Sequence, residues 1–288
     1  MLDSVQVEYT RMSKMAALAV FPGRPANDLA APRVGDRFHM GKIVAIGGGD
    51  FRTGETLALD REVVRLTGTS RPRALFIPTA SSDSVEDWEA FRAAYGGELG
   101  CDVNVLNLLT VPPSSRELAE AILSSDLVYV GGGNTLKMMR RWRKLGVDLL
   151  LRQAYDRGIV LSGVSAGAIC WFRYGHSDSM SFYRPEAWSY IRVEGMGLID
   201  ATACPHYDGD TAGVKRATDF QEMVKRRGDL GIGIDNCCAL EVVDGGYRVI
   251  VSRTGAGAYK LYARAGEITA ESIPQSADFA PLADLLQK

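Results

Sequence analysis

The sequence lacks the usual marks of a membrane-spanning, nucleic-acid-binding or disulfide-stabilised protein. None of the apolar runs in its 288 residues approaches the roughly 20 residues needed to cross a bilayer. The formal net charge is −2 at pH 7 and there is no basic stripe, so the electrostatic footprint of nucleic-acid binding is missing. The five cysteines are odd in number and form no C-x-x-C pair, which favours a reducing cytoplasm.

Phosphate-binding motifs are absent and histidine is scarce. The glycine runs Gly47–Gly49 and Gly131–Gly133 match neither G-x-G-x-x-G nor G-x-x-x-x-G-K-[ST], so a nucleotide site is not indicated and we expect no cofactor. Histidine occurs only as His39, His176 and His206. Few residues are therefore available as a catalytic base.

What is present is an ordinary globular composition behind an unusual N-terminal stretch. Hydrophobic residues make up 46% of the chain, which fits one large domain. Residues 1–40 contain an apolar patch at 16–21, which is at the short end for a signal peptide. We expect residues 1–40 to be a flexible N-terminal extension and residues 41–288 to form a single catalytic domain.

From residue 42 onward, strand-like and helical patterns alternate. Apolar segments typical of strands cover 42–46, 74–78, 102–106, 126–130 and 159–164, and helical patterns cover 55–66, 85–95 and 136–157, with capping-box spacings at Asp83/Glu86 and Ser114/Glu117. This alternation predicts a mainly parallel sheet with helices on both faces. After residue 228, the segments 240–243 and 247–251 predict an antiparallel hairpin at one sheet edge, followed by a strand near 258–263.

The most informative segment is residues 159–170. An apolar strand enters Gly163-Val164-Ser165-Ala166-Gly167 and continues into small helix formers. Such a turn holds a serine in a strained conformation and presents its hydroxyl beyond the end of the strand. The amide of Ala166 and the positive end of the following helix face whatever the hydroxyl attacks. Ser165 is therefore our candidate nucleophile, and a turn that serves packing alone is the alternative.

The glycine runs belong to the same rim of the predicted sheet. Ligands of parallel sheets bind beyond the carboxyl ends of the strands, where Gly131–Gly133 also lies. The backbone amides of Gly133 or Asn134 are candidates for a second oxyanion donor beside Ala166. Glycines that only permit a sharp turn are the simpler interpretation.

A serine hydroxyl needs a neighbouring base, and two histidines follow Ser165. His206 comes after Pro205 and a strand-like segment at 197–203, so we expect it at a strand end on the same rim. His176 lies in residues 174–179, which we interpret as a loop, and is the alternative base.

Three motifs resemble the peptidase E and cyanophycinase family of serine peptidases: Val130-Gly131-Gly132-Gly133-Asn134-Thr135, the elbow at 163–168, and Pro205-His206. The segment 170–179 is similar to a bacterial branch of peptidase E-like proteins. The resemblance covers roughly residues 42–263 and implies a three-layer α/β/α sandwich related to the class I glutamine amidotransferases. Those enzymes carry a cysteine at the elbow, where this chain has Ser165. The 41 positions from Ser165 to His206 are too few for an α/β-hydrolase.

The resemblance implies a charge-relay triad in which Ser165 is the nucleophile and His206 the base. Asp178 is the best match for the acidic member, and its role would be to hold the imidazole in the right tautomer. An acid that follows the histidine, Asp235 or Glu241, is the other arrangement.

These observations predict a serine-type exopeptidase or dipeptidase that acts on small peptides, with aspartyl dipeptides or an isopeptide bond as candidate substrates. Nucleic-acid and membrane partners are not expected, and monomer and homodimer both stay open. Four arginines are candidates for holding a substrate carboxylate: Arg52, Arg173, Arg184 and Arg192.

Two alternatives come from other classes of protein. The first is a metal-dependent hydrolase, whose mixed nitrogen and oxygen ligands would come from His176, Asp178, His206, Asp208 and Asp210. The second is a noncatalytic ligand-binding relative that kept the fold.

Overall fold

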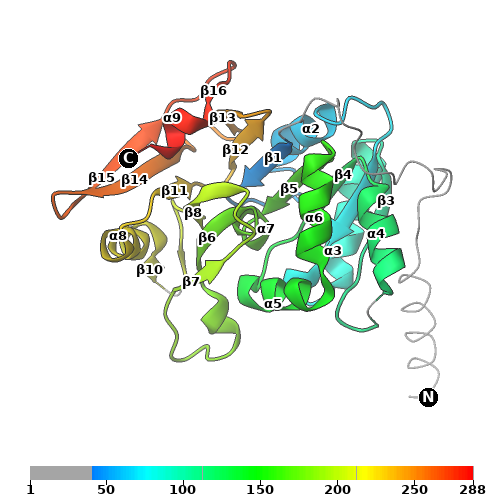
Figure 1. Cartoon of the computed structure of the whole chain (residues 1–288), viewed down its shortest axis with the longest axis horizontal. Coiled ribbons are helices and arrows are strands. Elements are labelled where there is room, and N and C mark those ends of the chain that lie inside the picture. The colour runs from blue at the N-terminus through cyan, green and yellow to red at the C-terminus, as the bar shows by residue number, and fades with distance from the viewer. Residues whose placement is uncertain (1–40, 112, 212, 288) are drawn as a thin grey trace.

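The computed structural model of the chain describes residues 41–287 apart from residues 112 and 212, so the expected extension over residues 1–40 lies outside the described residues. The described residues form two large β-sheets and one small two-stranded sheet, with helices packed around them (Figure 1). The larger sheet has the order β16 (Ala280–Pro281), β13 (Gly246–Val251), β12 (Cys238–Val243), β1 (Lys42–Ile46), β5 (Val160–Val164), β4 (Leu127–Val130), β2 (Arg73–Ile77) and β3 (Asp102–Val105). The run from β1 to β3 is parallel throughout, which confirms the predicted mainly parallel sheet.

Helices cover both faces of the larger sheet because its strands are apolar on both sides. In β1, for example, Ile43 and Ala45 belong to one core, whereas Val44 and Ile46 belong to the core on the opposite face. The first core is covered by α4 (Ser115–Leu123), α5 (Thr135–Leu145) and α6 (Val147–Asp156). The second is covered by α2 (Leu57–Arg65), α3 (Val85–Phe91) and the π-helical η3 (Arg92–Glu98). The three-layer α/β/α arrangement is therefore confirmed.

A second sheet, which the sequence did not predict, stands beside the first. Its order is β15 (Glu267–Ile273), β14 (Ala258–Arg264), β11 (Gly231–Ile234), β8 (Ile199–Pro205), β6 (Phe172–Ser177) and β7 (Ile191–Glu194). Helix α8 (Arg216–Arg227) packs on it through Phe220 and Val224, which contact Cys204 and Leu261. The loop predicted at 174–179 is wrong, because residues 172–177 form β6, which pairs with β7 and β8.

The predicted C-terminal hairpin is confirmed as β12 and β13. β12 pairs antiparallel with β1, so the hairpin extends the larger sheet as expected. The strand predicted near 258–263 is β14, which instead belongs to the smaller sheet. The remaining elements are η2 (Thr79–Ser81), α7 (Ala166–Ile169), η4 (Ser179–Phe182), β9 (Asp210–Thr211), β10 (Val214–Lys215) and α9 (Leu282–Leu286).

Two local predictions need correction. The helix predicted over 136–157 is interrupted at Gly146, whose left-handed φ of 73° ends α5 and starts α6. The capping box at Asp83/Glu86 is also wrong, because Ser84 caps α3 and the Asp83 carboxylate accepts hydrogen bonds from the amides of Leu108 and Leu109. The box at Ser114/Glu117 is present as predicted. Across the described residues, no helix is long and apolar enough to cross a membrane.

Candidate active site

Ser165 lies at a sharp turn between β5 and α7. Its φ of 57° and ψ of −110° are unusual for a residue with a side chain, as expected for an elbow. The turn depends on close backbone packing, since a Cβ added to Gly167 would lie 2.1 Å from the Val130 carbonyl oxygen. The Ser165 amide donates a hydrogen bond to the carbonyl of Ile46, 3.1 Å away, and this bond ties the elbow to the end of β1.

Two backbone segments near Ser165 are candidates for an oxyanion site. Ala166 is the first residue of α7, where an amide has no acceptor within its own helix. The loop after β4 lies beside the serine, and a Cβ added to Gly132 would be 3.4 Å from the Ser165 Cβ and 3.9 Å from its Oγ. A Cβ added to Gly133 would lie 2.5 Å from the Ala80 carbonyl oxygen, and the Gly133 amide stays a candidate second donor.

The amide of Asn134 has a different role from the one we expected. Its N–H donates to the Ala80 carbonyl at 2.9 Å, and its side-chain oxygen caps α5 by accepting from the Lys137 amide. The loop therefore approaches Ser165 through Gly132, while Asn134 anchors the start of the helix.

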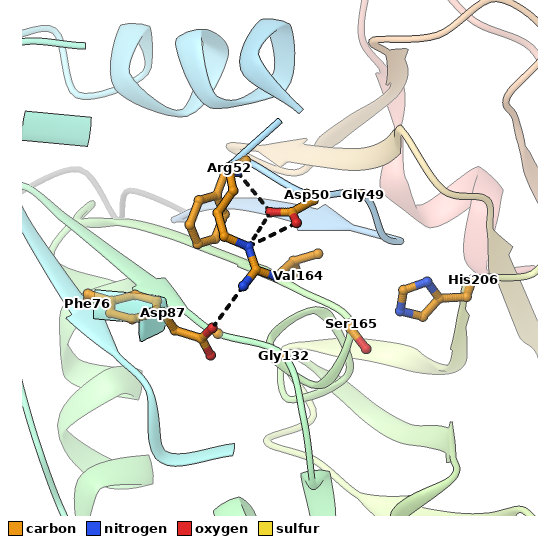
Figure 2. Close-up of a pocket in the computed structure, with 11 residues that line it drawn as sticks. Gly49, Asp50, Arg52, Phe76, Asp87, Gly132, Val164, Ser165 and His206 are labelled. Atoms are coloured by element: carbon orange, nitrogen blue, oxygen red, sulfur yellow. Dashed lines mark hydrogen bonds and ion pairs between the residues drawn. The ribbon is translucent and has the colours of Figure 1, made fainter. Parts of the chain in front are cut away.

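His206 leaves the end of β8 and faces the serine. Its φ is 50°, and its amide donates a hydrogen bond to the carbonyl of Gly47 at 3.0 Å. Since the Ser165 amide is hydrogen-bonded to Ile46, the consecutive carbonyls of Ile46 and Gly47 hold both catalytic candidates. Figure 2 shows the His206 imidazole extending toward the side on which Ser165 lies, and both residues line the same cavity.

The inner side of the His206 ring contacts an amide. Nδ1 lies 2.6 Å from Oδ1 of Asn236, which follows β11 by two residues. The pair packs so closely on the segment after β1 that a Cβ added to Gly48 would lie 2.1 Å from the Asn236 oxygen and 2.3 Å from Nδ1. Burial, together with the positive charge of Arg216, holds the pKa of His206 below its ordinary value.

The acidic residues proposed for the triad have other partners. Asp178 forms an ion pair with the buried Arg216. Asp235 accepts from the Gly257 amide at 2.9 Å, and Glu241, inside β12, binds Arg248 at 2.7 Å.

The predicted contact between His206 and Asp178 is therefore replaced by the contact with Asn236. Asp178 belongs to a different ion pair, although it lies close enough for its charge to raise the pKa of His206 slightly against the larger opposing effects. The negative charge of Asp178 is thus near the His206 imidazole, but the hydrogen bond at Nδ1 is made with the Asn236 side-chain amide.

His176 is fully buried within β6 and is held as a structural residue. Its Nε2 lies 2.9 Å from Asp219, and its ring stacks on Tyr190 with centroids 4.1 Å apart. Burial lowers its pKa to about 4. His176 and His206 thus have separate partners, and the described residues contain no group of three or more His, Cys, Asp and Glu side chains arranged to hold a metal ion. The metal-dependent alternative has no ligand cluster there.

A cavity of about 310 Å³ opens between Ser165 and the loop that follows β1. Phe51 and Phe76 also line it. Figure 2 shows Arg52 between Asp50 and Asp87 on the side away from His206. The Arg52 guanidinium binds Asp50 at 2.9 Å and lies 4.0 Å from Asp87. Of the four arginines singled out from the sequence, Arg52 alone is in this cavity.

Arg173 and Arg192 lie at the other end of the smaller sheet, in a separate cavity. They pair with Asp200 at 2.9 Å and with Asp229 at 2.6 Å, respectively. Sequence reasoning missed Asn236 as the partner of His206. Asn236 lies just beyond a strand, on the same rim as Ser165, and this position is the signal that could have identified it.

The α/β fold and the serine at a strand-to-helix elbow are typical of hydrolytic enzymes that work by acyl transfer. The chain belongs to peptidase family S51, whose model matches residues 43–250. It is 34% identical over 238 residues to the uncharacterized peptidase YgaJ of Bacillus subtilis, which covers 82% of this chain and 98% of YgaJ. It is also 33% identical over 99 residues to peptidase E of Shigella sonnei, covering 34% of this chain and 41% of that protein.

Two solved structures have a similar fold. A peptidase from an acI-B1 Actinobacterium superposes with a TM-score of 0.65 at 18% identity, covering 85% of this chain and 98% of that one. A peptidase E-type protein from Listeria monocytogenes EGD-e gives a TM-score of 0.56 at 22% identity, covering 74% and 98%. At these identities the likeness concerns the fold. The protein is a peptidase with a peptidase E-like fold.

Proposed function

We propose that this peptidase is a serine-type enzyme that hydrolyses small peptides through an acyl-enzyme on Ser165. The observation that carries the proposal is that an elbow serine and a histidine line the same cavity, with their amides hydrogen-bonded to two consecutive carbonyls at the end of β1. A serine becomes a useful nucleophile only beside a base, and His206 is the imidazole on this rim.

The chemistry follows from the positions of these groups. Nε2 of His206 takes the proton from the Ser165 hydroxyl as Oγ bonds to the peptide carbonyl carbon. The resulting oxyanion accepts hydrogen bonds from the Ala166 amide and from the loop at Gly132. His206 then gives the proton to the departing amine as the C–N bond breaks. A water molecule, deprotonated by the same imidazole, hydrolyses the acyl-enzyme and restores Ser165.

The size and charge of the cavity support a short, charged substrate. A volume of about 310 Å³ lies at the lower end of ligand pockets and fits one or two amino-acid residues. The guanidinium of Arg52, fixed by Asp50, is available to a substrate carboxylate on the same wall. We therefore place an acidic residue at or next to the scissile bond, in an aspartyl dipeptide or an isopeptide.

The cellular setting that we propose is the cytoplasm. All five cysteines are buried and free, which suits a reducing compartment. A small peptide is the partner that this site requires.

The test is a substrate screen with the purified protein and its Ser165→Ala variant. Asp-X dipeptides, β-aspartyl dipeptides and a cyanophycin-like polymer form the panel. We expect hydrolysis of at least one class and labelling by a fluorophosphonate, both lost in Ser165→Ala with a fall of several orders of magnitude in kcat. Turnover that persists in a correctly folded Ser165→Ala variant would refute the serine mechanism.

A further inference from the structure

A chain of polar contacts extends from His206 away from the cavity. Asn236 presents Oδ1 to Nδ1 of the imidazole at 2.6 Å. On its other side, the Asn236 Nδ2 and its backbone N–H both donate to Oδ1 of Asp208, each at 2.8 Å. Arg253 binds the second oxygen of Asp208 at 3.0 Å. The order is imidazole, amide, carboxylate and guanidinium.

The carboxylate decides which way the amide points. An asparagine side chain has a donor end and an acceptor end, and only the donor end is attracted to a carboxylate. Because Asp208 takes the Nδ2 hydrogen, the oxygen of Asn236 must face His206. The backbone amide of Asn236 and Arg253 hold Asp208 in place for this purpose.

The direction of the amide in turn decides the tautomer of the imidazole. An oxygen at Nδ1 requires a hydrogen on Nδ1, which leaves the lone pair of Nε2 free to accept the serine proton. A flipped amide would present its NH2 group to Nδ1 and leave the hydrogen on Nε2, where it blocks that transfer.

We propose that Asn236 orients His206 and that Asp208 fixes the direction of the Asn236 amide, so that a neutral group contacts the base and the negative charge lies one residue farther out. Both are positioning residues, and the proposal rests on the proposed function, in which His206 is the base. It differs from a triad in which a carboxylate contacts the histidine directly.

The charges around His206 give this arrangement a consequence for pH dependence. Burial and then the charge of Arg216 from α8 lower the pKa of His206, while the hydrogen bond to Asn236 and the charges of Asp178 and Asp208 raise it by smaller amounts. Each of these carboxylates is itself paired with an arginine. The amide contact only partly offsets burial and Arg216, so the net effect favours the neutral imidazole. We expect the acid limb of kcat/KM to lie below pH 6.5.

The test exchanges the amide and the carboxylate. In Asp208→Asn the anchor of the amide is lost, and we expect kcat to fall about 10-fold or more. In the double variant Asn236→Asp/Asp208→Asn, a carboxylate contacts His206 and an amide supports it from behind. We expect this variant to recover activity lost in Asp208→Asn and to move the acid limb of kcat/KM upward by about one pH unit or more.

The control is Asp210→Asn, which removes an exposed carboxylate at the start of β9, two positions from Asp208, and is expected to leave the rate and the profile unchanged. An acid limb that stays in place in an active double variant would overturn the proposal, as would full activity in Asp208→Asn. Fluorophosphonate labelling of the wild-type Ser165 separates this result from a failure of the proposed function, because an unreactive serine would contradict the latter.

A second measurement needs no variant of the network. The chain has only three histidines, so ¹⁵N NMR of histidine-labelled protein resolves each ring, and His206→Gln assigns the signal. We expect His206 to carry its hydrogen on Nδ1 at neutral pH. A neutral ring with its hydrogen on Nε2 would contradict the proposal directly.

Discussion

Two strained residues face each other at the heart of the site. Ser165 and His206 both have positive φ values, 57° and 50°, which a residue with a side chain seldom adopts. Each such conformation costs about 1–3 kcal/mol unless the surroundings enforce it. Here the amide of each residue is bonded to a carbonyl at the end of β1, and these bonds offset part of the cost. The strained backbone conformations direct the two side chains toward the same cavity, and they lower the folding stability of the protein.

Gly48 packs against both His206 and Asn236, so a side chain at this position should disturb the base. In Gly48→Ala the new Cβ would lie 2.1 Å from Oδ1 of Asn236 and 2.3 Å from Nδ1 of His206, so the ring must move. Because a displacement of about 1 Å costs about 10²-fold in rate, we expect kcat/KM to fall by that factor. Steady-state kinetics measure the change, and Gly97→Ala, where a Cβ would meet nothing within 4 Å, is the matched control. Equal rates in the two variants would contradict the assignment.

At the scale of single elements, β6 shows how a strand places a histidine where it must stay neutral. His176 is fully buried between Asp219, Cys204 and the ring of Tyr190. Burial is the main reason that its pKa is about 4, although hydrogen bonding to Asp219 acts in the opposite direction. The strand is therefore a source of acid sensitivity that is independent of the catalytic rim.

The sign of this effect follows from proton linkage. Between about pH 4 and pH 6.5 the unfolded chain binds a proton at His176 that the folded chain does not, so stability falls as the pH is lowered through this range. The full effect is about 3 kcal/mol. Urea unfolding at pH 7 and pH 4.5 should therefore show a smaller loss of unfolding free energy in His176→Asn than in the wild type. An equal loss in both proteins would rule out His176 as a source of the acid sensitivity.

The elements that were predicted correctly from the sequence are those whose structure is determined by their own residues and not by pairing with distant segments. The strand at 42–46 and the elbow at Ser165 follow from apolar runs and glycine spacing, and both are found as expected. β6 was missed because Phe172–Ser177 has no alternating pattern and becomes a strand only by pairing with its neighbours.

The partner of the base was missed for a similar reason. His206 and Asn236 are 30 positions apart, and only the meeting of β8 with β11 brings them together. Asp178 was the better candidate by residue type, yet Arg216, 38 positions away, neutralises it. A contact between distant segments cannot be inferred from the residue types alone.

At the scale of the whole described fold, one core joins the two sheets. Leu161 and Leu240 from the larger sheet share a buried cluster with Ile199 and Ile232 from the smaller one. The site lies where strand ends of both sheets meet, since Ser165 follows β5 and His206 follows β8. A shared core of this kind makes the two sheets depend on each other for stability.

We therefore expect the two sheets to unfold together. Thermal unfolding followed by far-UV circular dichroism and by tryptophan fluorescence should give one transition with the same midpoint. Ile232→Ala, in the smaller sheet, should lower that common midpoint for both probes, because it removes about 2–5 kcal/mol of core packing. Two separate transitions, or a shift seen by one probe only, would show that the sheets are independent units.

The carbonyls of Ile46 and Gly47 at the end of β1 set the spacing between the backbone of the nucleophile and that of the base through covalent geometry. Ile46 and Gly47 are consecutive, so their spacing is that of one peptide unit, about 3.8 Å between Cα atoms, and no side-chain substitution alters it. The backbone at the end of β1 therefore acts as a fixed spacer between the candidate nucleophile and the candidate base, whatever side chains line the cavity.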